Sequence, residues 1–131
     1  MAQVTYLQLE EVLAIRDGIM GQTTGRKGIL DFTLLHSALE RPKATFAGQD
    51  LYKNLFDKAS ALIHSFIQNH PFNDGNKRTA LGAMVRFLYV NGYVLKAEKH
   101  EIVDFTLKIQ NHKYKFKDIA LWVKKHVKKM K

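Results

Sequence analysis

A stretch in the middle of the chain gathers the residue types needed to handle a phosphate group. It separates two helical patterns and reads His70-Pro71-Phe72-Asn73-Asp74-Gly75-Asn76-Lys77-Arg78. Gly75 lets the backbone approach a ligand closely, because it has no side chain. The residues after it open the following helix, whose free N–H groups and positive dipole end favour an anion. Two of them, Lys77 and Arg78, add positive charge at the same point.

Two further groups in this stretch have acid–base or metal-binding chemistry. Asp74 can hold a divalent cation that bridges phosphate oxygens, because Mg²⁺ takes few carboxylates and fills its shell with phosphates and waters. His70 can accept a proton from an attacking hydroxyl, because an ordinary imidazole is mostly neutral at about pH 7. A structural interpretation is also open, with Asp74-Gly75 as a turn, Asp74 as a helix cap and both cations solvated. The presence of all these groups in one loop before a helix favours the functional interpretation.

The stretch resembles the signature of the Fic family, His-x-Phe-x-Asp/Glu-Gly-Asn-x-Arg. It is most similar to the death-on-curing (Doc) branch of that family, in which lysine follows the asparagine. The similarity covers about residues 4–95 and includes four segments upstream of the loop: 28–31, 34–42, 46–48 and 50–52. It implies an all-α fold of Fic/Doc type, with one compact helical domain over residues 1–131, a short extended flap and a central buried helix.

The resemblance also assigns roles to the loop residues. His70 would be the general base that acts on a protein hydroxyl, and Asp74 would hold Mg²⁺ or orient the nucleotide, ATP. The anion cradle would consist of Gly75, Asn76, Lys77 and Arg78. We interpret Phe72 as the apolar anchor that pins the loop to the core.

Two positions separate the Doc branch from the adenylyl-transferring majority of the family. That majority has glycine in place of Lys77 and a second arginine in place of Leu81. A lysine here fills space that the α- and β-phosphates would need for adenylyl transfer. Doc proteins are understood to bind ATP in the reverse sense and to phosphorylate a threonine of elongation factor Tu, which stops translation. We therefore expect a kinase-like toxin of a toxin–antitoxin module, with adenylyl transfer as the alternative.

Control of such a toxin is expected to come from a separate antitoxin protein. Family members that inhibit themselves carry Ser/Thr-x-x-x-Glu-Gly/Asn, and this sequence contains no such run. The nearest candidate, Ser37-Ala38-Leu39-Glu40, has the wrong spacing. We expect an acidic or amphipathic antitoxin segment that binds in a groove as a helix.

Composition limits the other classes of function. The chain has 131 residues, 46% of them hydrophobic, and no cysteine, which fits one globular domain without disulfides or thiolate metal sites. Its first residues show no basic and apolar leader pattern. No apolar run approaches the roughly 18 residues that span a bilayer. We therefore expect a cytoplasmic protein with no membrane partner.

The net charge of +9 raises the question of nucleic-acid binding. Residues 112–131 carry eight lysines and one acid, a net of +7, and the rest carries 13 basic and 11 acidic residues, a net of +2. The basic character is therefore a C-terminal feature. We expect the solvated face of a last helix to carry Lys124, Lys125, Lys128, Lys129 and Lys131. No arginines or aromatics are interleaved among these lysines, so a nucleic-acid surface is the weaker interpretation.

Two alternatives come from other functional classes. A toxin ribonuclease with an Arg-x(4–6)-His pair would suit a small basic helical protein, but none of the five arginines has a histidine at that spacing. A non-enzymatic module that binds nucleic acid or a partner protein would suit the lysine-rich end. It would leave the loop residues unexplained, and it would keep its activity after mutation of His70.

Apolar spacing and helix signals predict the elements that lie before the loop. A first helix should begin at a capping box of Thr5 and Gln8 and end near Gly18 or Gly21. Asp31 should cap a second helix, which must stop before Pro42. Residues 44–49 are expected to form an irregular segment or a short flap, and the resemblance makes them a candidate wall for an extended peptide substrate. A plain connecting loop is the alternative.

The remaining elements are predicted in the same way. A third helix over about residues 51–69 should deliver His70 to the loop, with His64 as a structural histidine. Residues 80–90 are apolar nearly all round, which indicates a centrally buried helix closed by Asn91-Gly92. A short strand or extended connection at 93–96 and two further helices complete the prediction.

Overall fold

The computed structural model describes residues 3–22 and 25–130. Its helices are α1 (Leu9–Met20), α2 (Phe32–Glu40), α3 (Leu55–Asn69), α4 (Asn76–Val90), α5 (Lys99–Gln110) and α6 (Phe116–His126). Two 3₁₀ turns flank α2, namely η1 (Gly25–Gly28) and η2 (Arg41–Lys43). Two antiparallel strand pairs are present, β1 (Thr45–Phe46) with β2 (Gln49–Asp50) and β3 (Tyr93–Leu95) with β4 (Val127–Lys129). The fold is therefore all-α, as predicted, and none of the helices described is long and apolar enough to cross a membrane.

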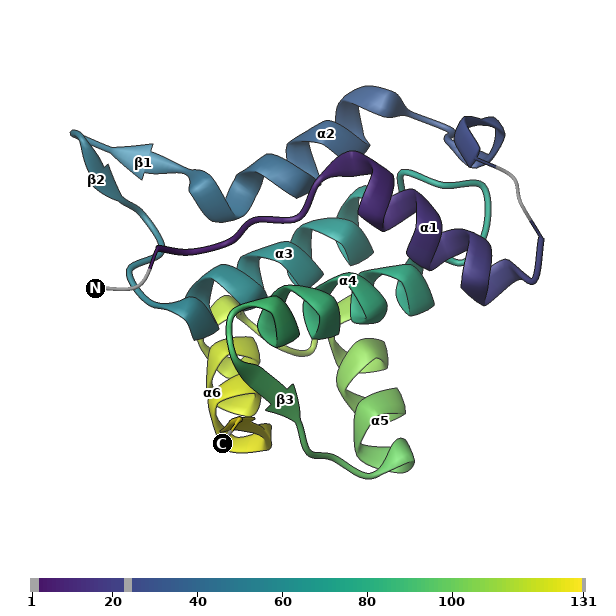
Figure 1. Cartoon of the computed structure of the whole chain (residues 1–131). Helices are drawn as coiled ribbons and strands as arrows, with labels where there is room; N and C mark the ends of the chain where they lie inside the picture. Colours follow the sequence, from purple (N-terminus) through teal and green to yellow (C-terminus); the bar gives the residue numbers. More distant parts are fainter. Residues whose placement is uncertain (1–2, 23–24, 131) are drawn as a thin grey trace.

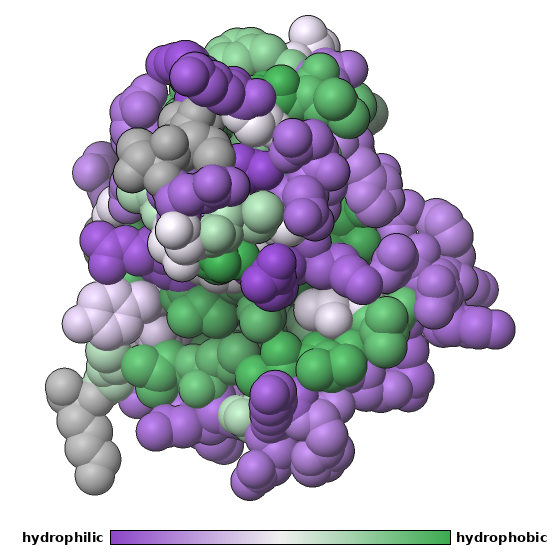
Figure 2. All heavy atoms as spheres, turned by 90° about the vertical axis from the view of Figure 1, so that its right-hand side faces the viewer, coloured by the Kyte–Doolittle hydropathy of each residue, from purple (hydrophilic) through white to green (hydrophobic). Residues whose placement is uncertain are grey.

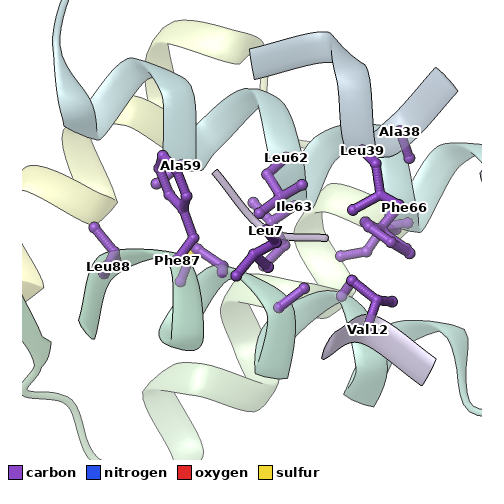
Figure 3. Close-up of a cluster of buried hydrophobic side chains, with 14 of the residues drawn as sticks. Leu7, Val12, Ala38, Leu39, Ala59, Leu62, Ile63, Phe66, Phe87 and Leu88 are labelled. Carbon is purple, nitrogen blue, oxygen red and sulfur yellow. The ribbon is translucent and has the colours of Figure 1, made fainter. Parts of the chain in front are cut away.

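Helices α3 and α4 lie side by side at the centre and run in opposite directions (Figure 1). The loop that joins them, residues 70–75, is called the motif loop below. α2 packs on α3, α1 packs on α4, and α5 and α6 pack on the other side of α3. The predicted central buried helix is α4, and apolar side chains from its neighbours form one core with it. Figure 3 shows part of that core: Leu7, Val12, Ala38, Leu39, Ala59, Leu62, Ile63, Phe66, Phe87 and Leu88.

Two helices begin at residues other than those predicted, because different side chains cap them. α1 is preceded by a capping box of Gln8 and Glu11, so the prediction of Thr5 and Gln8 was wrong. Thr5 instead pairs with the side chain of Asn91, which accepts its N–H at 2.8 Å and donates to its carbonyl at 2.8 Å. α3 begins four residues later than the predicted start at residue 51, after Asn54, whose side chain accepts the N–H of Asp57 at 2.9 Å.

The end of the chain also differs from its prediction. α6 stops at His126, and the next three residues pair with β3 as strand β4. Lys124 and Lys125 are exposed in the last turn of α6, as expected, but Lys128 and Lys129 belong to the strand. Lys131 lies outside the described residues. β4 forms because its backbone pairs with the edge of β3, about 30 residues earlier in the chain. Helix signals among neighbouring residues contain no information about such a pairing.

The β1–β2 hairpin is the predicted flap. Both strands are exposed. The base of the hairpin is tied to the first turns of α3 by buried Lys58, whose Nζ donates to Asp50 Oδ2 at 3.1 Å and to the Tyr52 carbonyl at 2.7 Å. The motif loop follows the opposite end of α3, which has 15 residues and is therefore roughly 22 Å long. The two lie far apart (Figure 1), so the hypothesis that residues 44–49 form a wall of the site is wrong.

Candidate functional site

The motif loop begins where α3 turns out of helical geometry at His70. This residue is left-handed, with φ 49° and ψ 56°, and its N–H donates to the Phe66 carbonyl at 3.3 Å. Pro71 follows, and it cannot continue the helix. A left-handed conformation costs a non-glycine residue roughly 1–2 kcal/mol, so the surrounding structure must hold it. The imidazole itself is exposed.

Phe72 and Asn76 close the loop from within. The Phe72 ring is 1% exposed and stacks on Phe66, with ring centroids 6.5 Å apart. Asn76 accepts the Phe72 N–H at 2.9 Å and donates its amide to the Phe72 carbonyl at 2.8 Å. The Asn76 side chain is therefore used to shape the loop, and its backbone N–H is one of the groups at the helix start that lack an acceptor within the helix.

Residues 28–31 flank the loop on one side. The Pro71 carbonyl accepts the N–H groups of Leu30 at 2.8 Å and Asp31 at 3.1 Å. The Asn73 N–H donates to the Gly28 carbonyl at 3.1 Å, and Ile29 forms an isolated bridge with Phe72. Residues 28–31 therefore lie beside the loop, where residues 44–49 were predicted to lie.

Gly75 caps α4 in the left-handed region, with φ 79°. A Cβ there would lie 2.9 Å from Sδ of Met20, so a larger residue would meet both backbone strain and a close contact. The cap is therefore Gly75 and not Asp74, whose Oδ1 accepts the Gly75 N–H at 2.7 Å. The Gly75 carbonyl accepts the N–H of Thr79 at 2.9 Å. The N–H groups between these two residues have no acceptor one turn earlier in the helix, which leaves them for an anion.

The charges at this helix end are unusual. The first turn of α4 contains Lys77 and Arg78 and no acidic residue. Among residues 3–22 and 25–130, no ion pair includes either of these cations. The positive end of the helix dipole opposes cations. A bound anion would therefore relieve the repulsion that these two side chains experience.

One pocket of about 270 Å³ collects these groups. Its lining residues are His70, Asn73, Asp74, Gly75, Asn76, Lys77, Arg78 and Gln110. The structure thus brings the predicted polar and glycine residues together, with Phe72 buried beneath them. Asn73 and Gln110 were not assigned a role from the sequence. Gln110 ends α5, which is tied to α3 by a bond from Gln68 Nε2 to the Ile109 carbonyl at 2.8 Å, and no local signal links it to the loop.

Comparison with known proteins identifies the family. Residues 6–88 match the profile of the Fic/DOC family. The chain belongs to this family. It is 44% identical over 93 residues to "Toxin Doc" of Mycolicibacterium smegmatis, over 71% of this chain and 69% of that protein. It is 29% identical over 102 residues to "Protein kinase doc" of Escherichia phage P1, over 78% of this chain and 79% of that protein.

The matched region of this Fic/DOC protein runs from just before α1 to the last turns of α4. It contains the motif loop and residues 28–31. Helices α5 and α6 lie outside the matched region. Gln110 is therefore the pocket residue that the family profile does not cover.

The donor set fits Mg²⁺ bound together with a phosphate. Asp74 is exposed in the pocket, and one of its carboxylate oxygens accepts the Gly75 N–H. Within the part of the chain that the structure describes, no cluster of three or more His, Cys, Asp or Glu side chains could hold a metal ion alone. A single carboxylate with phosphate oxygens and waters is the coordination that Mg²⁺ commonly takes.

An apolar slot of about 330 Å³ adjoins the pocket at the motif loop. Lys77 and Arg78 line both, and the slot is completed by Leu81, Ile102, Val103, Thr106 and Leu107. Figure 2 shows an apolar band that crosses this end of the molecule between two hydrophilic regions. Leu81, at the position where the adenylyl-transferring proteins are expected to have a second arginine, therefore lines the slot opposite apolar residues of α5.

Proposed function

We propose that this protein is the toxin of a toxin–antitoxin module, acts in the cytoplasm, and phosphorylates a translation factor. The expected reaction transfers the γ-phosphoryl group of ATP to a hydroxyl of elongation factor Tu. The observation that carries the proposal is the first turn of α4, where Lys77 and Arg78 stand at an anion-binding helix end beside His70. The names of the two relatives, a Doc toxin and a Doc protein kinase, support both parts of it.

Each loop residue has a role in this proposal. ATP, when bound, supplies the phosphoryl group. The N–H groups at the start of α4, together with Lys77 and Arg78, bind phosphate oxygens and stabilise charge that develops during transfer. Asp74 holds Mg²⁺. His70 accepts the proton that the acceptor hydroxyl loses, and its exposed imidazole is accessible to a protein substrate.

The choice between kinase and adenylyl transferase depends on Lys77. Phosphoryl transfer requires the correct phosphorus to face the hydroxyl, so a side chain that excludes one orientation of ATP decides the product. Lys77 occupies the cradle, and Leu81 adds no second cation to it, which supports γ-transfer. Adenylyl transfer is the second candidate, because the rest of the motif is shared with those enzymes.

Label transfer from ATP tests this choice directly. With Mg²⁺ and elongation factor Tu, the wild-type protein should transfer label from the γ-phosphate and none from the α-phosphate. Lys77→Gly should lose γ-transfer and gain at most weak α-transfer. Lys99→Gly, which removes an exposed lysine from the first turn of α5, is the matched control and should keep wild-type transfer. Transfer of the α-label by wild-type protein would assign the chain to the adenylyl transferases.

Substitution of His70 separates enzyme from binding module. General-base catalysis contributes about 10²- to 10⁴-fold, so His70→Ala should lower the transfer rate by about that factor. The fold should persist, because the imidazole is exposed. His100→Ala, at another exposed histidine, serves as the control. Growth inhibition that survives in the folded His70→Ala protein would favour a non-enzymatic binding module.

Control by a separate antitoxin completes the proposal. The apolar slot and the exposed side chains of Val103 and Leu107 suit the apolar face of a partner helix. An acidic group on that helix could reach Arg78 at the edge of the phosphate pocket. Expression of this chain alone should arrest the growth of a susceptible bacterium, and harmless accumulation of the folded wild-type protein would contradict the proposal.

A further inference from the structure

A buried arginine reaches the motif loop from α1. Arg16 is only 2% exposed, although a guanidinium keeps its charge inside a protein. Its Nε donates to the Asp74 carbonyl at 3.1 Å, and its Nη2 donates to Asn73 Oδ1 at 2.6 Å. The guanidinium carbon also lies 4.8 Å from the centroid of the Phe72 ring. One side chain from a distant helix therefore contacts three successive residues of the loop.

Gly28 provides the space that this guanidinium occupies. A Cβ on Gly28 would overlap the Nη1 and Cζ atoms of Arg16. The Gly28 backbone does not lie in the left-handed region, so the requirement for glycine here is one of space rather than of conformation. The Gly28 carbonyl accepts the Asn73 N–H at 3.1 Å, so the same residue also supports the loop directly.

We propose that Arg16 is a positioning residue for the transfer reaction, and that Gly28 is small in order to admit it. Arg16 holds the backbone of Asp74 and the side chain of Asn73, and through them it orients the groups that line the phosphate pocket. The catalytic consequence depends on the proposed function. The contacts of Arg16 with Phe72, Asn73 and Asp74, called the clamp below, do not depend on that function. Their effect on the loop can be measured without turnover.

The geometry of arginine explains why this residue suits the position. Its planar guanidinium carries donors in a fixed fork, so one group can bond a carbonyl and an amide oxygen at the same time. Its flat face also stacks on an aromatic ring. A lysine would keep the charge but would offer one compact ammonium to two acceptors, Asp74 O and Asn73 Oδ1, that Arg16 reaches through different nitrogens.

Kinetics and amide hydrogen exchange test the clamp together. Misplacement of a catalytic group by about 1 Å can cost about 10²-fold in rate, so Arg16→Ala should lower kcat by roughly that factor. The KM for ATP should change much less, because Lys77, Arg78 and the helix N–H groups remain. Exchange at residues 72–76 should become faster. Arg16→Lys, which keeps a charged donor, should show a smaller change in both measurements than Arg16→Met, which fills similar space without a donor. A purely space-filling role would make these two variants equal.

Arg26→Ala is the matched control. Arg26 is exposed and pairs with Glu10 of α1 at 2.9 Å, so its loss removes another contact to α1 without touching the loop. Its kcat and loop exchange should equal those of wild type. A folded Arg16→Ala protein with wild-type kcat and wild-type exchange at residues 72–76 would overturn the proposal.

A double-mutant cycle tests the pairing with Gly28. Gly28→Ala should lower kcat and speed loop exchange, because the added methyl group displaces the guanidinium. Once Arg16 is alanine, the same change should have little further effect, since residues that act through one contact are not additive. Additive effects would show that Gly28 acts independently of Arg16. If Arg16→Ala does not fold, Arg16→Lys and Gly28→Ala decide the question. If wild-type protein transfers no phosphate, the proposed function fails. Amide hydrogen exchange at residues 72–76 then still shows whether Arg16 fixes the loop.

Discussion

A short connecting segment lies at each end of α3, and the two segments differ in the number of bonds that fix them to the rest of the protein. The β1–β2 hairpin precedes the helix and the motif loop follows it (Figure 1). Each is attached through a cation that is 2% exposed, Lys58 for the hairpin and Arg16 for the loop. The loop is also bonded to residues 28–31 and closed by Asn76. In the hairpin, both strands project into solvent.

A phenylalanine in each region shows the consequence of this difference. Phe72 of the loop is 1% exposed, and Phe46 of the hairpin is 64% exposed. The loop can therefore present an exposed imidazole from a backbone that is fixed on several sides. Precise placement of reactive groups requires such support, and the hairpin lacks it. An exposed side chain, such as that of His70, can therefore be carried by a backbone that is held in place on several sides.

The largest expected effect comes from truncating the buried phenylalanine. Phe72→Ala should lower the free energy of unfolding by about 3–5 kcal/mol, the range seen when a buried phenylalanine is lost. Phe46→Ala should change it by less than about 0.5 kcal/mol, because the exposed ring loses little contact. Chemical denaturation of both variants measures the difference. Similar losses in the two would show that the hairpin is packed as tightly as the loop.

A smaller effect is expected from the cation that anchors the hairpin. Lys58→Met keeps most of the apolar stem but removes the donor to Asp50 and to the Tyr52 carbonyl. Loss of hydrogen bonds from a charged donor should cost about 1–3 kcal/mol in the free energy of unfolding. The rate of phosphoryl transfer should not change, because the hairpin lies at the far end of α3. A large loss of transfer in the folded variant would mean that the hairpin contributes to the site after all.

The smallest expected effect is a pH dependence in the middle of α3. Burial, then the positive charge of Arg41 and then that of His112, lowers the pKa of His64 below its ordinary value of 6.5. Arg41 Nη1 donates to His64 Nδ1 at 2.7 Å, which requires that nitrogen to be unprotonated. The unfolded chain therefore binds this proton more readily, and the free energy of unfolding should fall as the pH drops below about 6.5.

Denaturation at several pH values checks this sign. His64→Gln should flatten the fall in the free energy of unfolding between about pH 7.5 and about pH 5.5, because the titrating group is gone. His36→Gln, at an exposed histidine on α2, is the matched control. Equal pH slopes in wild type and His64→Gln would exclude His64 as the source. This pH dependence arises from the hydrogen bond between Arg41 and His64 of α3, so the structure of the motif loop should not change with it.

Patterns among neighbouring residues were sufficient to predict most of the helices and the residues of the candidate site. Helical spacing, the cap at Asp31 and the stop before Pro42 are signals carried by neighbouring residues, and α2 follows them. The pocket residues from His70 to Arg78 lie within one short stretch, so the chain brings most of them together wherever the loop is placed. The family resemblance depends on the same local pattern, and the family comparison confirmed it.

The contacts between segments that are distant in the sequence became known only from the folded chain. Strand β4 exists because β3 offers it an edge, and Gln110 reaches the pocket because α5 packs on α3. The hairpin lies away from the site because α3 separates it from the motif loop. Arg16 meets Asn73 across 57 positions of sequence. These contacts depend on how whole elements pack, and spacing between neighbouring residues carries no information about them.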